Sequence, residues 1–194
     1  MPSSSYTTPS AKFTFAIHPS APSVVQYLGS PPDAPPTFSF TTPPNESDIA
    51  LYQGFPNPNS IVGTVSLTES TFKHRGNPGT LDRVSMGESC DVSCPLGSFK
   101  WAADMGGDGH YCWTLKNKSG EKFAKLGGGK KSDRLAMGDK KLEFYFTGND
   151  ALVELAVLTA LMIASGVKSK TSKKDSAKGV VTALHLLSTI MGGP

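Results

Sequence analysis

Residues 150–167 read DALVELAVLTALMIASGV and would be apolar on every side of a helix. A helix that is hydrophobic all round has to be surrounded, either by lipid or by the rest of its own protein. A membrane span needs about 20 apolar residues, whereas this run offers only about 15 and contains Glu154. We therefore predict a helix that is buried inside a β-structure.

The ends of this stretch are typical of a helix in a soluble protein. Asp150 is expected to act as the N-cap, and Glu154 lies near the first turn, where the helix dipole favours a negative charge. Gly166 can take the left-handed position after the last turn, with Val167 folding back toward Met162. At 1.5 Å per residue the helix would be about 22 Å long, enough to run through a small domain.

Short segments with alternating apolar side chains precede this helix and are predicted to be strands. They are residues 12–17, 24–28, 37–41, 49–53, 61–67, 98–102, 111–115, 122–126 and 141–147, with 81–86 as a weaker candidate inside the less regular segment 71–94. In 61–67 the alternation predicts one face with Ile61, Gly63, Val65 and Leu67. The fold class that follows is mainly β (α+β): a closed antiparallel β-barrel around a central hydrophobic C-terminal helix that fills its lumen.

The chain divides into three parts by composition. Residues 1–11 are rich in Ser, Thr and Pro and are expected to be disordered. Residues 12–167 would form the barrel and its helix. Residues 168–194 read as a lysine-rich linker followed by a short amphipathic helix at 180–191, which we expect to pack on the outside of the barrel.

Basic residues are concentrated in the second half of the chain. Residues 1–98 hold four basic against seven acidic residues, whereas residues 116–141 hold nine against three. A surface of this kind indicates an anionic partner or serves solubility. The three cysteines, and an N-terminus without the apolar core of a secretory signal, favour a reducing compartment. We therefore expect a cytoplasmic monomer without a transmembrane span.

Several segments together resemble a family of fungal domains of unknown function. They are LGSPPDAPPTFSFTT (28–42), DIALYQGFPNPNSIVGTVSL (48–67), FKWAAD (99–104), YCWTLKNKSGEKFAKL (111–126) and the ending LEFYFTGNDALVELAVLTALMIASG (142–166). That family is similar in plan to the superfamily of the tubby C-terminal domain, the phospholipid scramblases and the plant LURP-one-related proteins. The resemblance implies a barrel wrapped around a hydrophobic helix, with members that bind phosphoinositides or act at membranes. The tail after Val167 departs from the compact ending of that superfamily.

A basic hairpin is the strongest candidate for a binding site. The residues are Lys116, Lys118, Lys122, Lys125, Lys130, Lys131 and Arg134. Outward positions on paired strands would bring Lys116 and Lys122 together, which makes an electropositive patch able to meet phosphoinositide head groups. The alternative is an ordinary solvated β face whose lysines discourage edge pairing.

Other candidate chemistry is weaker. Cys90, Cys94, His110 and Cys112 could supply a Cys₃His zinc site. Their spacing is not that of a standard zinc knuckle, so isolated core or loop cysteines are favoured, and we assign no metal and no cofactor. Residues 127–132 (GGGKKS) resemble a phosphate loop only superficially, because Ser132 comes one residue late and no helix follows.

Nucleic-acid binding and catalysis are both disfavoured. Single-strand binders use exposed aromatic rings, whereas Trp101, Tyr111 and Trp113 lie on the apolar faces of their predicted strands. The remaining histidines, His18, His74 and His185, have no carboxylate partner near in sequence. No catalytic constellation emerges, and we predict that the protein is not an enzyme.

Two functional hypotheses remain. The first is a non-enzymatic, tubby-like domain that binds an anionic membrane surface and is cytoplasmic or peripheral to membranes. The second is a protein-interaction scaffold or effector-type protein that docks a partner through the helix at 180–191.

Overall fold

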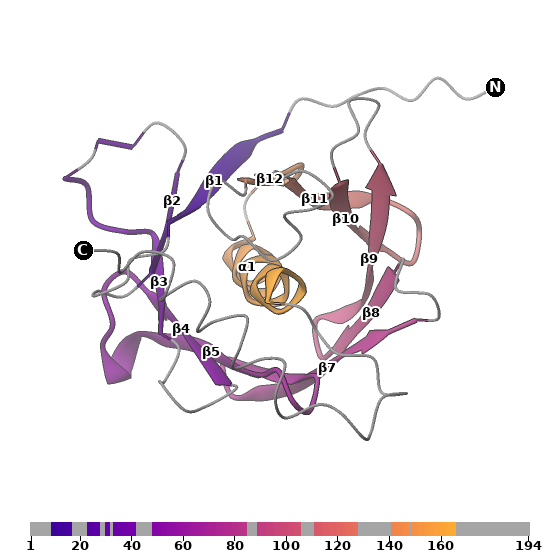
Figure 1. Ribbon diagram of the computed structural model, residues 1–194, viewed down its shortest axis with the longest axis horizontal. Coiled ribbons are helices and arrows are strands. Elements are labelled where there is room, and N and C mark those ends of the chain that lie inside the picture. Colours follow the sequence, from indigo (N-terminus) through magenta and orange to yellow (C-terminus); the bar gives the residue numbers. More distant parts are fainter. Residues whose placement is uncertain are drawn as a thin grey trace, which may run out of the picture.

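The computed structural model describes residues 9–16, 23–27, 30–31, 33–41, 48–84, 89–105, 111–127, 141–147 and 149–165. In this part of the chain, antiparallel strands surround one helix, which Figure 1 shows end-on at the centre. The tail at 168–194, with its predicted linker and helix, lies outside the described residues, as does most of the segment predicted to be disordered.

The strands follow one another around the helix in chain order. They are β1 (Ala11–Ala16), β2 (Ser23–Tyr27), β3 (Phe38–Thr41), β4 (Asp48–Gln53), β5 (Ile61–Ser66), β6 (Thr71–His74), β7 (Asn77–Arg83), β8 (Ser89–Cys94), β9 (Gly97–Met105), β10 (Tyr111–Asn117), β11 (Lys122–Gly127) and β12 (Lys141–Phe144). A 3₁₀ turn, η1 (Pro58–Ser60), separates β4 from β5, and helix α1 (Asp150–Ala164) follows β12. The prediction of a mainly β, antiparallel fold with one apolar helix is therefore confirmed.

Every consecutive pair of strands is hydrogen-bonded, and β1 pairs with β2 on one side and with β12 on the other. The register of β1 with β12 places Phe13 opposite Leu142, and both side chains are buried. Their neighbours in register, Lys12 and Glu143, point away from the helix and form an ion pair of 3.1 Å. Alternation along the strands thus creates an apolar inner face and a charged outer face.

The less regular segment of the sequence, residues 71–94, contains three strands, β6, β7 and β8. Polar residues, Gly79 and Pro78 interrupt the apolar pattern there, although Phe72, Leu81 and Val92 are buried as strand residues should be. β6 and β7 form a hairpin with a two-residue turn, in which Arg75 has φ 48° and Gly76 has φ 81°. Two left-handed residues give the tight turn that fits the twist of a hairpin.

The predicted inward face of residues 61–67 is wrong at its first position. Ile61 is 46% exposed, and Val62 is buried in its place. The cause is a register shift between β4 and β5, where Leu51 pairs with Gly63 but Tyr52 pairs with Ile61. This bulge leaves Val62 without a partner residue on β4 and turns Ile61 outward.

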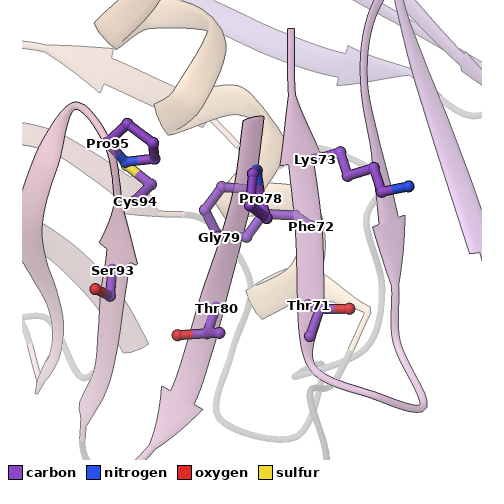
Figure 2. Close-up of a pocket in the computed structure, with 9 residues that line it drawn as sticks. All are labelled: Thr71, Phe72, Lys73, Pro78, Gly79, Thr80, Ser93, Cys94 and Pro95. Carbon is purple, nitrogen blue, oxygen red and sulfur yellow. The ribbon is translucent and has the colours of Figure 1, made fainter. Parts of the chain in front are cut away.

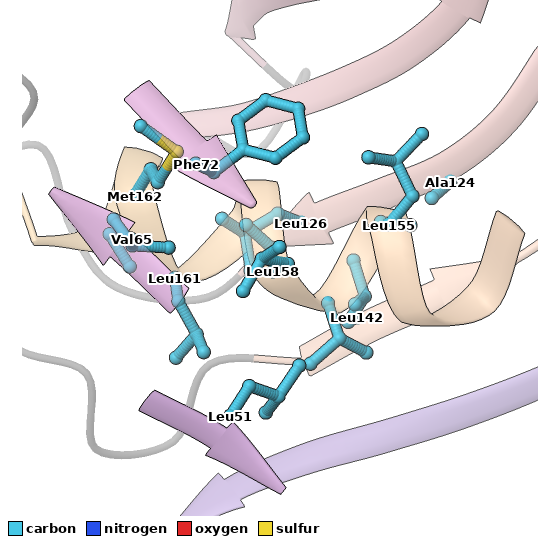
Figure 3. Close-up of a cluster of buried hydrophobic side chains, with 14 of the residues drawn as sticks. Leu51, Val65, Phe72, Ala124, Leu126, Leu142, Leu155, Leu158, Leu161 and Met162 are labelled. Atoms are coloured by element: carbon cyan, nitrogen blue, oxygen red, sulfur yellow. The ribbon is translucent and has the colours of Figure 1, made fainter. Parts of the chain in front are cut away.

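Helix α1 is enclosed over most of its length. From Leu155 to Met162 every residue is buried, and Leu158, Leu161 and Met162 are fully so. Figure 3 shows these side chains packed against apolar residues of the surrounding strands, among them Leu51, Leu126 and Leu142. Complete burial of each such side chain is worth about 1.5–3 kcal/mol, so the helix is the principal apolar core of the domain.

Two contacts fix the helix against the strands. A Cβ atom added to Gly63 would collide with the backbone oxygen of Lys73 and lie 2.9 Å from a methyl group of Leu158, so β5 approaches the helix closely only because residue 63 is glycine. On the other side, Nε1 of buried Trp101 donates a hydrogen bond of 3.1 Å to Oγ1 of Thr159. The polar atom of the indole is thereby satisfied inside the core.

The helix begins one residue earlier than predicted. Asn149 is the N-cap, and its side-chain oxygen accepts a hydrogen bond of 3.1 Å from the backbone nitrogen of Leu152. Asp150 instead lies in the first turn, where its charge suits the helix dipole. Ser165 is the C-cap, and Gly166 lies outside the described residues. No helix in the described ranges is long and apolar enough to cross a membrane.

Candidate anion-binding face

The hairpin of β10 and β11 carries the candidate lysines. Asn117 closes its turn, since its side-chain oxygen accepts a hydrogen bond of 2.9 Å from the backbone nitrogen of Glu121. Gly120 supplies the left-handed residue, with φ 82°. Lys118 is exposed in this turn. The predicted hairpin that carries these lysines is therefore present.

A bulge in β11 aligns Lys122 with Lys116. Leu115 pairs with Ala124, but the next residue, Lys116, pairs with Lys122, so that Phe123 has no direct partner. Phe123 packs against the core, with its ring centroid 5.7 Å from that of Phe99. The bulge thus sends an aromatic side chain to the core and puts two lysines directly opposite each other.

The like-charged pair continues onto β9. Lys116 also pairs with Lys100, which lies between the buried residues Phe99 and Trp101 and is itself exposed. We call Lys100, Lys116 and Lys122 the lysine row. Side chains directly opposite on paired strands are about 4.5–5.5 Å apart at Cβ, and like charges in that arrangement destabilise a sheet. Asp91 pairs with Lys100 on the side of β8, with 3.7 Å between the charged groups, but both side chains are exposed, so this ion pair contributes little.

Lys122 lies in a partly buried setting. Its ammonium group is 3.4 Å from the centroid of the Tyr145 ring, and the Tyr145 hydroxyl donates a hydrogen bond of 2.9 Å to Glu143. Burial, followed by the positive charges of Lys125 and Lys116, holds the pKa of Lys122 below its ordinary value despite the opposing effect of Glu143. An anion at the lysine row would relieve this repulsion.

Lys125 belongs to a different, balanced set of charges. It pairs with Thr114 on one side and with Glu143 on the other, and Glu143 is also bound by Lys12. Burial opposes ionisation of Glu143, but hydrogen bonds from Tyr145 and Lys12 hold its pKa below the ordinary value. Of the predicted site, Lys116, Lys118 and Lys122 therefore come together and Lys125 lies beside them. Lys130, Lys131 and Arg134 lie outside the described residues.

A second charged cluster, which the sequence did not reveal, lies near the start of α1. Glu154 is 2% exposed and forms a two-pronged ion pair with Arg75, through hydrogen bonds of 2.7 and 2.6 Å. Nε2 of buried His74 lies 2.9 Å from the same carboxylate. Burial by itself raises the pKa of a carboxyl, but the hydrogen bonds from Arg75 and His74 hold the pKa of Glu154 below its ordinary value.

This cluster adds two features to the sequence analysis. The carboxylate partner of His74 lies 80 residues away in the chain, and Glu154 neutralises Arg75 in a β-hairpin turn in addition to lying near the start of the helix. A single glutamate in an otherwise apolar buried helix was the available signal, because a buried charge needs a partner. The identity of that partner could not be read from sequence, since 79 residues separate Glu154 from Arg75. The cluster binds α1 to the β6–β7 turn, and we assign it a structural role.

The cysteines do not converge in the described part of the chain. Cys90 is buried on β8, and burial raises its pKa to about 11, so that the thiol stays protonated at neutral pH. Cys112 lies on β10, which is separated from β8 by β9. No group of three His, Cys, Asp or Glu side chains in the described ranges could hold a metal ion, and His110 lies outside them.

A shallow depression of about 510 Å³ lies over β6, β7 and β8, with Thr71, Lys73, Thr80 and Ser93 among its lining residues (Figure 2). It is open to solvent, and Lys73 is the one basic residue in its lining. The lysine row lies elsewhere, on β9–β11. We therefore regard the lysine row, rather than this depression, as the candidate site.

Comparison with known proteins adds no functional information. No protein-family model matches the chain, and no curated protein or solved structure is significantly similar to it. The resemblance to tubby-like domains accordingly stays a prediction, and the function has to be inferred from the geometry of the chain itself.

Proposed function

We propose that the chain is a non-enzymatic, tubby-like closed β-barrel domain that binds an anionic membrane surface of the phosphoinositide type through the lysine row and Lys118. The observation that carries the proposal is the row itself: three lysines opposite one another on three adjacent strands. A fold gains nothing from such an arrangement, since opposed like charges destabilise a sheet. A multivalent anion converts the same arrangement into a favourable one.

The expected affinity follows from the number of charges. Each lysine close to an anionic membrane contributes about 1 kcal/mol, so the row and Lys118 together contribute about 4 kcal/mol. That corresponds to a dissociation constant of about 1 mM. Binding by the lysines alone would therefore be weak, reversible and sensitive to salt.

Vesicle flotation tests the proposal. The protein should float with phosphatidylcholine vesicles that contain phosphatidylinositol bisphosphate, and should not float with pure phosphatidylcholine. Replacing Lys100, Lys116 and Lys122 together by Glu should abolish flotation. Lys141→Glu is the matched control. Lys141 is exposed at the first position of β12, at the end of the ring opposite to the β10–β11 turn, and it pairs with the uncharged residues Gly127 and Thr14. Equal flotation of the triple variant and the wild type would refute the proposal.

A further inference from the structure

Three exposed apolar side chains lie at the same end of the ring of strands. Among the described residues, the large apolar side chains that are exposed are Phe55 (67%), Ile61 (46%), Leu96 (44%) and Val84. Phe55 lies in the connection from β4 to β5, Ile61 is the first residue of β5, and Leu96 lies in the turn from β8 to β9. In an antiparallel ring these two connections lie at the same end, whereas Val84, at the end of β7, lies at the opposite end. We call Phe55, Ile61 and Leu96 the apolar rim.

The lysine row lies close to this same end. Lys116 is the last residue but one of β10 and Lys122 is the first residue of β11, so both border the β10–β11 turn that carries Lys118. That turn is at the end of the ring that holds the β4–β5 and β8–β9 connections. The exposed acidic residues nearby in the described chain include Glu121 and Asp150, while Arg75 neutralises Glu154. This end of the domain thus combines apolar side chains with a bordering patch of positive charge.

Phe55 projects from an ordered turn. The backbone oxygen of Phe55 accepts a hydrogen bond of 3.2 Å from the hydroxyl of Ser60, and the side chain of Asn57 caps η1 by accepting from the backbone nitrogen of Asn59 at 2.9 Å. Ile61 is turned outward by the bulge between β4 and β5. Single exposed apolar residues are ordinary on protein surfaces. Here three of them share one end with a like-charged row, and both features are fixed by local backbone structure.

We propose that the apolar rim inserts into the interface of an anionic bilayer while the lysine row contacts the phosphates. This inference rests on the proposed function and extends it, because it adds the anchor that the weak lysine contribution requires. Apolar side chains at the boundary of head groups and acyl chains add to electrostatic attraction, and binding strength grows with both contributions. The membrane would then meet the end of the ring at which α1 begins.

Flotation of single variants tests the anchor. With phosphatidylcholine vesicles that contain phosphatidylserine, Phe55→Asp and Leu96→Asp should each lower the partition coefficient by about tenfold. Val84→Asp is the matched control and should leave it unchanged, since Val84 is exposed at the opposite end. Thermal unfolding of all three variants verifies that they remain folded. In a second experiment, lipids with brominated acyl chains should quench the fluorescence of a Phe55→Trp variant and not that of Val84→Trp.

The possible outcomes separate the two proposals. If the wild type binds no anionic vesicle, the proposed function fails and the anchor fails with it. If the wild type binds and the lysine-row variant does not, but Phe55→Asp and Leu96→Asp behave as Val84→Asp does, the anchor alone is overturned. If Phe55→Asp leaves vesicle binding intact and converts a dimer into a monomer in light scattering, the rim is an interface between two copies of the chain, which also overturns the anchor.

Discussion

At the scale of the residue, repulsion between like charges in the lysine row lowers the stability of the fold. Lys116 lies between Lys100 and Lys122 in register, so its ammonium group has a like charge on each side. Cross-strand pairs of opposite charge are favourable by about 0.2–1 kcal/mol, and like charges are unfavourable. Stability and anion binding therefore place opposite demands on residue 116.

Replacing Lys116 by Glu should change stability and anion binding in opposite directions. We expect Lys116→Glu to raise the free energy of unfolding by about 0.5–1 kcal/mol, because it creates two attractive cross-strand pairs in place of two repulsive ones. The same substitution should weaken flotation with anionic vesicles. Urea unfolding measures the first effect, and Lys141→Glu, which has no charged cross-strand partner, should change stability by less. A destabilised Lys116→Glu variant would show that the lysines do not repel one another.

Glu154 makes stability depend on pH. Its pKa in the folded protein is below the ordinary value of 4.5, so its ion pair with Arg75 stabilises the fold above that pH and is lost as the pH falls through the lowered pKa. Glu154→Gln removes the charge throughout. The free energy of unfolding should therefore be higher for the wild type at neutral pH, and the difference should narrow below about pH 4. A difference that stays constant from neutral pH to about pH 3 would contradict this assignment.

At the scale of the element, the contact between α1 and β5 explains why the helix fits inside the strands. Gly63 leaves just enough room for Leu158, which is fully buried. The helix itself was predictable, because residues 150–164 are apolar all round and begin with cap-forming residues. Its partner surfaces were not, because the packing of Gly63 on Leu158 joins residues that are far apart in sequence.

A double-mutant cycle tests that contact. Gly63→Ala should destabilise the fold by about 1–3 kcal/mol, the usual range for overpacking a core. Leu158→Ala should destabilise it by about 3–5 kcal/mol through the cavity that it leaves. Together the two substitutions should destabilise less than the sum, because the smaller side chain at 158 makes room for the added methyl group. Relief should be partial, since the backbone oxygen of Lys73 also opposes that methyl group. Strict additivity would mean that helix and strand do not touch there.

At the scale of the whole molecule, the sequence predicted the architecture better than the site. Alternating segments such as 49–53 and 111–115 lie inside observed strands, since burial of one face leaves a period of two in the sequence. Strands β6 and β8 were missed because each carries few apolar residues: Phe72 is the only one in β6, and Val92 lies among Ser, Cys and Asp in β8. Register and bulges depend on contacts between distant segments, so the bulges that expose Ile61 and align Lys116 with Lys122 could not be foreseen. Lys100 was not predicted as part of the site, because its position opposite Lys116 depends on the register between β9 and β10.

The central claim is that the lysine row binds a multivalent anion, and side-chain NMR of lysine ammonium groups tests it directly. Titration of the full chain with soluble inositol trisphosphate should shift the signals of Lys100, Lys116 and Lys122 together, with one common dissociation constant. The signal of Lys141 should not move. Shifts that are absent at saturating ligand, or that are as large at Lys141 as at Lys116, would contradict the claim.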